Sequence, residues 1–157
     1  MDQEAVIQYI TDTFAGVEVL RPTDGPGAGD TFFFYDPQRN IDPQRRMPFA
    51  TIVVKDYGDF DNASNLNRAD VFRLNIGVSR DTFRALFGRP PGEETATVTG
   101  HDFAALDRLM PHPVYAPQSW LCVLNPSRET FEAVKPLLAE AYAIVAARHS
   151  TSPTIRE

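Results

Sequence analysis

Residues able to do chemistry gather in the stretch Leu109–Trp120, LMPHPVYAPQSW, which holds His112 and the single tryptophan of the chain. His101 lies eleven residues before His112, and Cys122, the one cysteine, follows two residues after the tryptophan. An imidazole that titrates near neutral pH suits general acid–base catalysis, and a thiolate beside an imidazole suits nucleophilic catalysis. This stretch is therefore the first place to look for an active site.

The spacing of these residues does not support a metal or a nucleophile. The chain has one cysteine and three histidines, and neither C-x-x-C nor H-E-x-x-H occurs. Cys122 lies in SWLCVLN, which is apolar on both alternating faces, so we expect a buried thiol. Because no acid partner for His112 is identifiable, a loop histidine bonded to backbone is favoured over a general base. We assign no catalytic residue, no metal and no cofactor.

A polar set remains in the middle of the chain. Arg73 and Asn75 point the same way from one predicted strand, and Lys55 and Tyr57 share a face of its predicted neighbour. If the two strands pair, these four side chains form a cluster that could hold a carboxylate or a phosphate. A solvated sheet face with cross-strand pairs to Asp56 or Asp70 is favoured over such a site, because antiparallel sheets usually have one face in water.

Aromatic side chains in the histidine-containing stretch offer a second kind of contact. Tyr115 and Trp120 could form one wall of a ligand site, although burial against the C-terminal helix is the more frequent role for such rings. The candidate ligand-binding residues are therefore Lys55, Tyr57, Arg73, Asn75, His112, Tyr115 and Trp120.

The elements that position these residues follow from hydrophobic periodicity. Alternating or apolar runs predict strands at VEVLR, TFFFYD, MPFATIVVKDY, VFRLNIGV and SWLCVLN. Helical spacing predicts helices in DQEAVIQYITDTF, in RDTFRALFG after Ser79, in FAALDRLM after Asp102, and from Arg128 to around Arg148. In the last helix, Pro136 predicts a kink or a restart.

This order predicts a single α+β domain over residues 1–148 and a disordered tail over residues 149–157. The sheet is mostly antiparallel with about five strands, the helices lie on one side, and a long helix ends the domain. Along VFRLNIGV, Phe72, Leu74 and Ile76 are predicted to face inward, opposite to Arg73 and its alternating neighbours.

Composition narrows the classes of function. The net charge of −6 repels phosphates on average and makes nucleic acid an unfavourable partner, although residues 37–90 carry nine basic and six acidic side chains. The N-terminus lacks the features of a signal peptide, and no run of about 18 apolar residues predicts a membrane span. A lone cysteine forms no internal disulfide, so we predict a cytoplasmic protein.

Several segments together resemble an uncharacterised bacterial domain-of-unknown-function family. They are FFFYDP, PFATIVVKDY, VFRLNIGVSRDTF, HDFAALDRLMPHPVYAPQSWLCVLNP and LLAEAY, which span Phe32 to Tyr142. More remotely, the element order resembles MmcQ/YjbR-like proteins, in which a strand containing tryptophan also precedes the long last helix. That resemblance implies an arrangement likened to a double-wing DNA-binding motif. The closer family brings no activity to carry over.

Three functions are compatible with the sequence. The first is a non-catalytic module that binds a small anionic ligand or a protein partner through the face around Arg73 and Asn75. The second is a small enzyme that uses His112 in acid–base chemistry. Its partner would be Lys55, Tyr57 or Tyr115. The third is nucleic-acid binding, which rests on analogy of fold. A homodimer is also compatible with the sequence.

Overall fold

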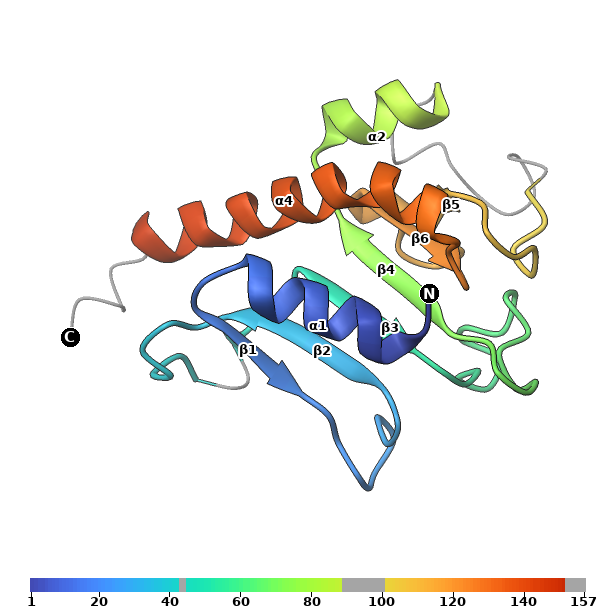
Figure 1. The fold of residues 1–157 in the computed structure, drawn as a ribbon, viewed down its shortest axis with the longest axis horizontal. Coiled ribbons are helices and arrows are strands. Elements are labelled where there is room, and N and C mark those ends of the chain that lie inside the picture. Colours follow the sequence, from blue (N-terminus) through green and yellow to red (C-terminus); the bar gives the residue numbers. More distant parts are fainter. Residues whose placement is uncertain (43–44, 89–100, 152–157) are drawn as a thin grey trace.

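The sheet is the frame of the molecule and is antiparallel throughout. A computed structural model describes residues 1–42, 45–88 and 101–151. Within these residues six strands form one sheet in the order β1-β2-β3-β4-β6-β5, and every neighbouring pair is antiparallel (Figure 1). The strands are β1 (Val17–Leu20), β2 (Thr31–Tyr35), β3 (Ala50–Val53), β4 (Arg73–Gly77), β5 (Met110–Pro111) and β6 (Trp120–Leu124).

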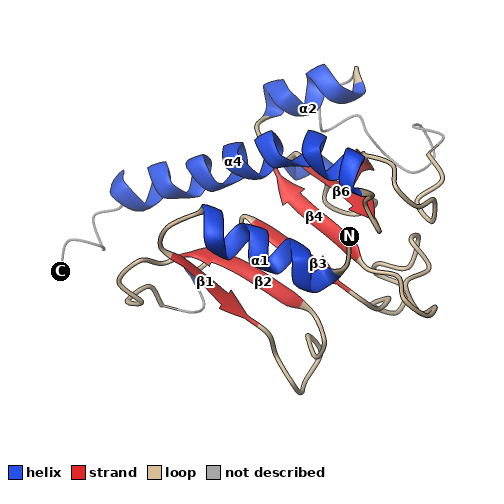
Figure 2. Cartoon of the chain, in the orientation of Figure 1, coloured by secondary structure: helices blue, strands red, loops and turns tan. Residues whose placement is uncertain are grey.

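In the described residues three α-helices are present, and Figures 1 and 2 show them on one face of this sheet. Helix α1 (Gln3–Thr13) begins where the side chain of Asp2 accepts a hydrogen bond from the Ala5 amide, and α2 (Arg80–Phe87) begins in the same way at Ser79. The long α4 (Arg128–Thr151) follows β6 and runs back along the sheet. The predicted α+β class, with helices on one side and a long C-terminal helix, is confirmed.

The main hydrophobic core lies between the helices and the sheet. Leu74 and Ile76 of β4 are fully buried there, as are the neighbouring residues of β3 and β6 at the same alternating positions. Phe131 and Leu138 of α4 pack against these strand residues and complete the core on the helix side. The predicted inward direction of Phe72, Leu74 and Ile76 is therefore confirmed.

The other face of the sheet carries a smaller apolar cluster and the candidate site. Val53, Cys122 and Leu124 point to this face because they alternate with core residues along their strands. Leu66 and Phe103, from the connections before β4 and β5, cover them. Loops rather than helices therefore cover this part of the second face.

The segment before β5 differs from its prediction. Residues 103–110 were expected to form a helix, but they form turns that end in β5, which is the sixth strand of the sheet. Asp107 explains the difference: its backbone takes a left-handed conformation with φ of 61°, and its carboxylate accepts a hydrogen bond from the Ser127 amide at 2.7 Å. This contact ties the segment to the start of α4 instead of allowing a helix.

The C-terminal helix is longer than predicted and is not interrupted. Helix α4 is one helix that passes through Pro136, so the alternative of a restart at this proline is wrong. It reaches Thr151, three residues beyond Arg148, and residues 152–157 of the predicted tail lie outside the described residues. The segment TATVT, which from its sequence could form a short strand, falls within residues 89–100 and lies outside them as well.

Candidate functional site

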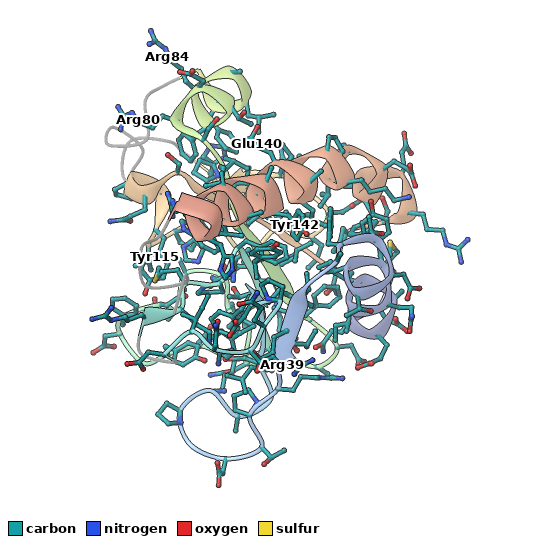
Figure 3. All side chains as sticks on the ribbon, turned by 90° about the vertical axis from the view of Figure 1, so that its left-hand side faces the viewer. Arg39, Arg80, Arg84, Tyr115, Glu140 and Tyr142 are labelled. Atoms are coloured by element: carbon teal, nitrogen blue, oxygen red, sulfur yellow. The ribbon has the colours of Figure 1, made fainter. Side chains whose placement is uncertain are left out.

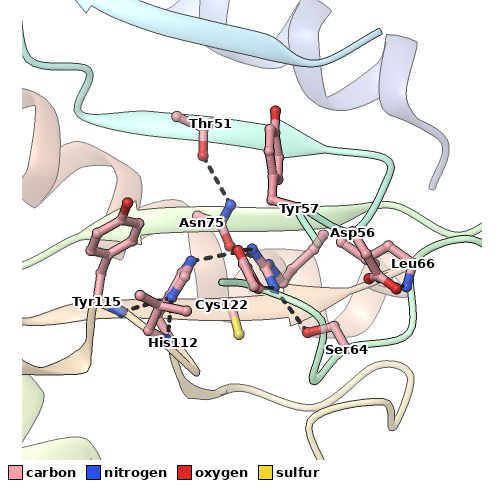
Figure 4. A network of polar contacts seen from close by, with 12 residues as sticks. Thr51, Asp56, Tyr57, Ser64, Leu66, Asn75, His112, Tyr115 and Cys122 are labelled. Carbon is pink, nitrogen blue, oxygen red and sulfur yellow. Dashed lines mark hydrogen bonds and ion pairs between the residues drawn. The ribbon is translucent and has the colours of Figure 1, made fainter. Parts of the chain in front are cut away.

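A buried polar network with Arg73 at its centre lies on the sheet face opposite the helices. Figure 4 shows three of its members, Ser64, Asn75 and His112, close to one another. The Arg73 side chain is 1% exposed, and its guanidinium grips Asp61 with two hydrogen bonds, from Nη1 to Oδ1 at 3.0 Å and from Nη2 to Oδ2 at 2.6 Å. Nη1 also donates to Ser64 Oγ at 2.9 Å, and Nε donates to Asn75 Oδ1 at 2.8 Å. Four of the five guanidinium hydrogens therefore have acceptors.

The Arg73–Asp61 ion pair fixes the charge of the site. Burial raises the pKa of the Asp61 carboxyl, but the hydrogen bonds and the charge of Arg73 outweigh this effect and hold the pKa below its usual value. Asp61 is thus ionised at neutral pH and neutralises the guanidinium. Such a buried pair is costly to break, because removal of one partner leaves the other charged in a place without water.

Asn75 links this pair to the next strand. It lies directly opposite Thr51 in the register of β3 and β4, and its Nδ2 donates to Thr51 Oγ1 at 2.9 Å. Because Asn75 Oδ1 already accepts from Arg73, the orientation of the amide is fixed by two partners. The predicted solvated face is absent at Arg73 and Asn75, which are 1% and 2% exposed.

His112 approaches the same guanidinium from the segment between β5 and β6. Its Nδ1 accepts hydrogen bonds from the backbone amides of Val114 and Tyr115 at 3.0 and 2.9 Å, and its Nε2 lies 3.3 Å from Arg73 Nη2. The ring is 3% exposed. Burial, followed by the charge of Arg73, lowers the pKa of His112 to about 3, so the ring is neutral at physiological pH.

This arrangement limits what His112 can do chemically. Two backbone donors occupy the lone pair of Nδ1, so the proton of the neutral ring resides on Nε2. Neither nitrogen is then available as a general base. Nε2–H remains a hydrogen-bond donor that faces Arg73.

Lys55 and Tyr57 form a separate group around Asp30. Lys55 Nζ lies 3.5 Å from Asp30 Oδ2, and the Tyr57 hydroxyl donates to the same carboxylate. Burial and this hydrogen bond raise the pKa of the Tyr57 hydroxyl, which stays protonated. The four residues of the predicted cluster therefore divide into two groups, each with its own aspartate.

A cleft of about 1220 Å³ opens beside the network on this face of the sheet. Thr51, Asn75 and Trp120 contribute to its lining from three neighbouring strands, and Arg73, Asp61, His112 and Tyr57 line it too. At the end of the sheet the cleft reaches Ile144 of α4. Of the seven candidate residues, six line the cleft, and Lys55 is the exception.

The mouth of the cleft carries exposed apolar side chains. Met47, Phe60 and Tyr115 line it and are 66%, 63% and 43% exposed. The rings of Phe60 and Tyr115 lie 6.0 Å apart between their centroids. Figure 3 shows Tyr115 on the side of the molecule away from α1.

Trp120 lies against the backbone of its neighbouring strand because residue 77 is glycine. Gly77 faces Trp120 in the register of β4 and β6, and a Cβ added at Gly77 would lie 2.9 Å from the indole ring. The indole thus occupies the space of the missing side chain and lines the cleft from there. The predicted burial of Trp120 against the last helix is not seen, because Trp120 points to the other face.

The matched family confirms the closer of the two resemblances. A family model matches residues 1–154 of the chain, and its description is a family of unknown function, DUF6194. The chain belongs to the DUF6194 family. No curated protein and no solved structure matches this DUF6194 chain. The likeness to MmcQ/YjbR-like proteins and the bacterial origin stay predictions.

The thiol and the potential metal ligands are the other groups of the DUF6194 chain with chemistry of their own. Cys122 is fully buried, as predicted, and burial raises the pKa of its thiol to about 12. Within residues 1–42, 45–88 and 101–151, no three His, Cys, Asp or Glu side chains are placed to hold a metal ion. No helix in these ranges is long and apolar enough to cross a membrane.

Sequence reasoning missed the partners of its own candidates. Asp61, Ser64 and Asp30 complete the two polar groups, and all three are nearly or fully buried. Asp61 and Ser64 lie in a turn-rich loop whose composition predicts solvent exposure. Arg73 itself could have pointed to these partners. An arginine that is buried between apolar strand residues needs a carboxylate beside it, and the aspartates of the neighbouring loop are candidates for that role.

Proposed function

We propose that this domain is a non-catalytic binding module whose cleft takes a small, mostly apolar molecule. One observation carries the proposal: exposed apolar side chains surround the mouth of a cleft whose inner wall is a fixed, buried polar network. Large exposed apolar groups that converge on a concavity are typical of ligand sites, where a few placed polar groups orient the ligand.

The charges of the site disfavour the anionic ligand predicted from sequence. Arg73 is neutralised by Asp61, and Lys55 lies beside Asp30. An anion at the polar end of the cleft would meet no unpaired cation from these two groups, and it would be repelled by both carboxylates. Arg80 and Arg148 line the cleft too, but from α2 and α4. The network therefore supports recognition by hydrogen bonds more than by charge.

The two other functions have less support. Acid–base catalysis by His112 requires a free lone pair, whereas Nδ1 accepts two backbone hydrogen bonds and the low pKa keeps the ring neutral. Nucleic-acid binding requires a positive surface, and the net charge is −6. A protein partner would bind to the same exposed apolar side chains at the mouth of the cleft. A cytoplasmic location is a further part of the proposal.

Binding of the uncharged dye Nile red tests the cleft. We expect its fluorescence to rise on addition of the protein, and the paired substitution Phe60→Ser with Tyr115→Ser to weaken binding about thirtyfold, since each exposed ring contributes about 1 kcal/mol of apolar contact. Both residues are exposed, so the fold is retained.

The matched control is Leu86→Ser with Leu106→Ser. These residues are 43% and 46% exposed and do not line the cleft. The control pair should bind the dye as the wild type does. Equal weakening by the two pairs, or no binding by the wild type, would contradict the proposed function.

A further inference from the structure

The polar end of the cleft holds two hydrogen-bond donors that face each other. Arg73 Nη2 lies 3.3 Å from His112 Nε2, and an arginine nitrogen only donates. His112 Nδ1 accepts from the amides of Val114 and Tyr115, which places the ring proton on Nε2. An N–H of the guanidinium and the N–H of the imidazole thus face each other, and neither has a hydrogen-bond acceptor within the part of the chain that the structure describes.

Neither side chain can rotate to separate the two donors without losing other hydrogen bonds. The other four guanidinium hydrogens of Arg73 bond to Asp61, Ser64 and Asn75, so a rotation would break buried hydrogen bonds. A flip of the His112 ring would remove the acceptor from two backbone amides. Both side chains are at least 97% buried and both line the cleft, so an acceptor can reach them from there.

Resting on the proposed function, we propose that the ligand carries an uncharged carbonyl oxygen that accepts hydrogen bonds from both Arg73 Nη2 and His112 Nε2. One oxygen with two lone pairs satisfies both donors at once. The rest of the ligand lies along the apolar part of the cleft, toward Phe60 and Tyr115. The ligand class is therefore a ketone, ester or amide with a mostly apolar body.

The charge of the site selects a carbonyl over a carboxylate. Arg73 and Asp61 together are neutral, and His112 is neutral as well. A carbonyl leaves the buried site neutral, whereas a carboxylate adds a negative charge next to that of Asp61. Burial of an uncompensated charge is strongly unfavourable, so the site discriminates against the acid.

Three fragments that displace Nile red test the inference: acetophenone, ethylbenzene and benzoate. They share a phenyl ring and differ in the group that would meet Arg73 and His112. We expect acetophenone to displace the dye at a concentration about five to ten times lower than ethylbenzene, as one or two net hydrogen bonds provide. Benzoate should be the weakest of the three.

The matched variant is His112→Asn. An asparagine Oδ1 can accept from the amides of Val114 and Tyr115 as Nδ1 does, but the side chain no longer reaches Arg73 as a donor. In this variant the preference for acetophenone over ethylbenzene should largely disappear, whatever the change in affinity for ethylbenzene itself. Circular dichroism and the melting temperature establish that it folds.

The possible failures are distinct. Equal displacement by acetophenone and ethylbenzene would overturn the carbonyl assignment, with a bound water as the acceptor, and would leave the proposed binding function standing. Tightest binding by benzoate would overturn it in favour of an anion. Displacement by none of the three, or no binding of Nile red, would contradict both the proposed function and this inference.

Discussion

Leu74 and Arg73 are neighbours on one strand and are almost equally buried, but opposite physical principles stabilise their two environments. Leu74 faces a continuous apolar core closed by α1 and α4. Arg73 faces a polar network, loops and an open cleft. The helix-covered face should tolerate substitutions between apolar side chains of similar volume, because apolar packing is not directional. The other face depends on a few exact hydrogen bonds, as is typical of a binding site.

The largest expected effect comes from breaking the buried ion pair. Asp61→Ala should lower the free energy of unfolding by about 3–5 kcal/mol, because it leaves the Arg73 charge buried without a partner. Urea unfolding measures the loss. In that background, Arg73→Met should restore at least half of it, since both buried charges are then gone.

The matched substitution on the helix-covered face is Leu74→Ala, which should cost about 2–5 kcal/mol through lost contacts and a cavity. Unlike the loss at Asp61, this one cannot be relieved by removal of its neighbours' side chains, which would enlarge the cavity. If Arg73→Met fails to rescue Asp61→Ala, the contrast between the two faces is wrong.

A smaller effect should appear as a dependence of stability on pH. The pKa of His112 is lowered to about 3, against about 6.5 for an unfolded histidine. Between these values the unfolded state binds more protons, so stability rises with pH in this window and falls as the pH drops below about 6.5. From pH 7.5 to pH 5 the loss attributable to His112 is about 2 kcal/mol.

Urea unfolding at both pH values checks this, with His112→Asn as the reference that removes the titrating group. Because His101 and His149 remain, the difference between the two proteins isolates His112. The variant should lose about 2 kcal/mol less than the wild type over this range. Equal losses in both proteins would show that His112 is not held neutral by its surroundings.

The fold was predictable where side chains alternate or repeat. The two faces of β4 were predicted correctly, with Leu74 and Ile76 on one and Arg73 and Asn75 on the other. Side chains alternate along any strand, so this pattern depends only on neighbouring residues. The helix expected over residues 103–110 was wrong, because a distant contact, from the Ser127 amide to Asp107, decides the local conformation. Such contacts between loops have no periodic signal.

The candidate site was predictable in its strand residues and not in its loop residues. Arg73, Asn75 and His112 were recognised by residue type, and the structure brings them together. Asp61 was not recognised, since nothing in a turn-rich loop indicates that it folds over the sheet. The cleft depends on these loops, so its place beside the network could not be derived from the sequence.

The most direct test of the central claim is a map of ligand contacts by ¹H–¹⁵N NMR spectroscopy during titration with acetophenone. If the face away from the helices is the binding face, the amides of Val114 and Tyr115 and the indole N–H of Trp120 should shift and saturate together. The amides of Gln8 and Asp12, on the exposed side of α1, should not move. Shifts confined to the helix-covered side, or no saturable shift around Tyr115 and Trp120, would contradict the account.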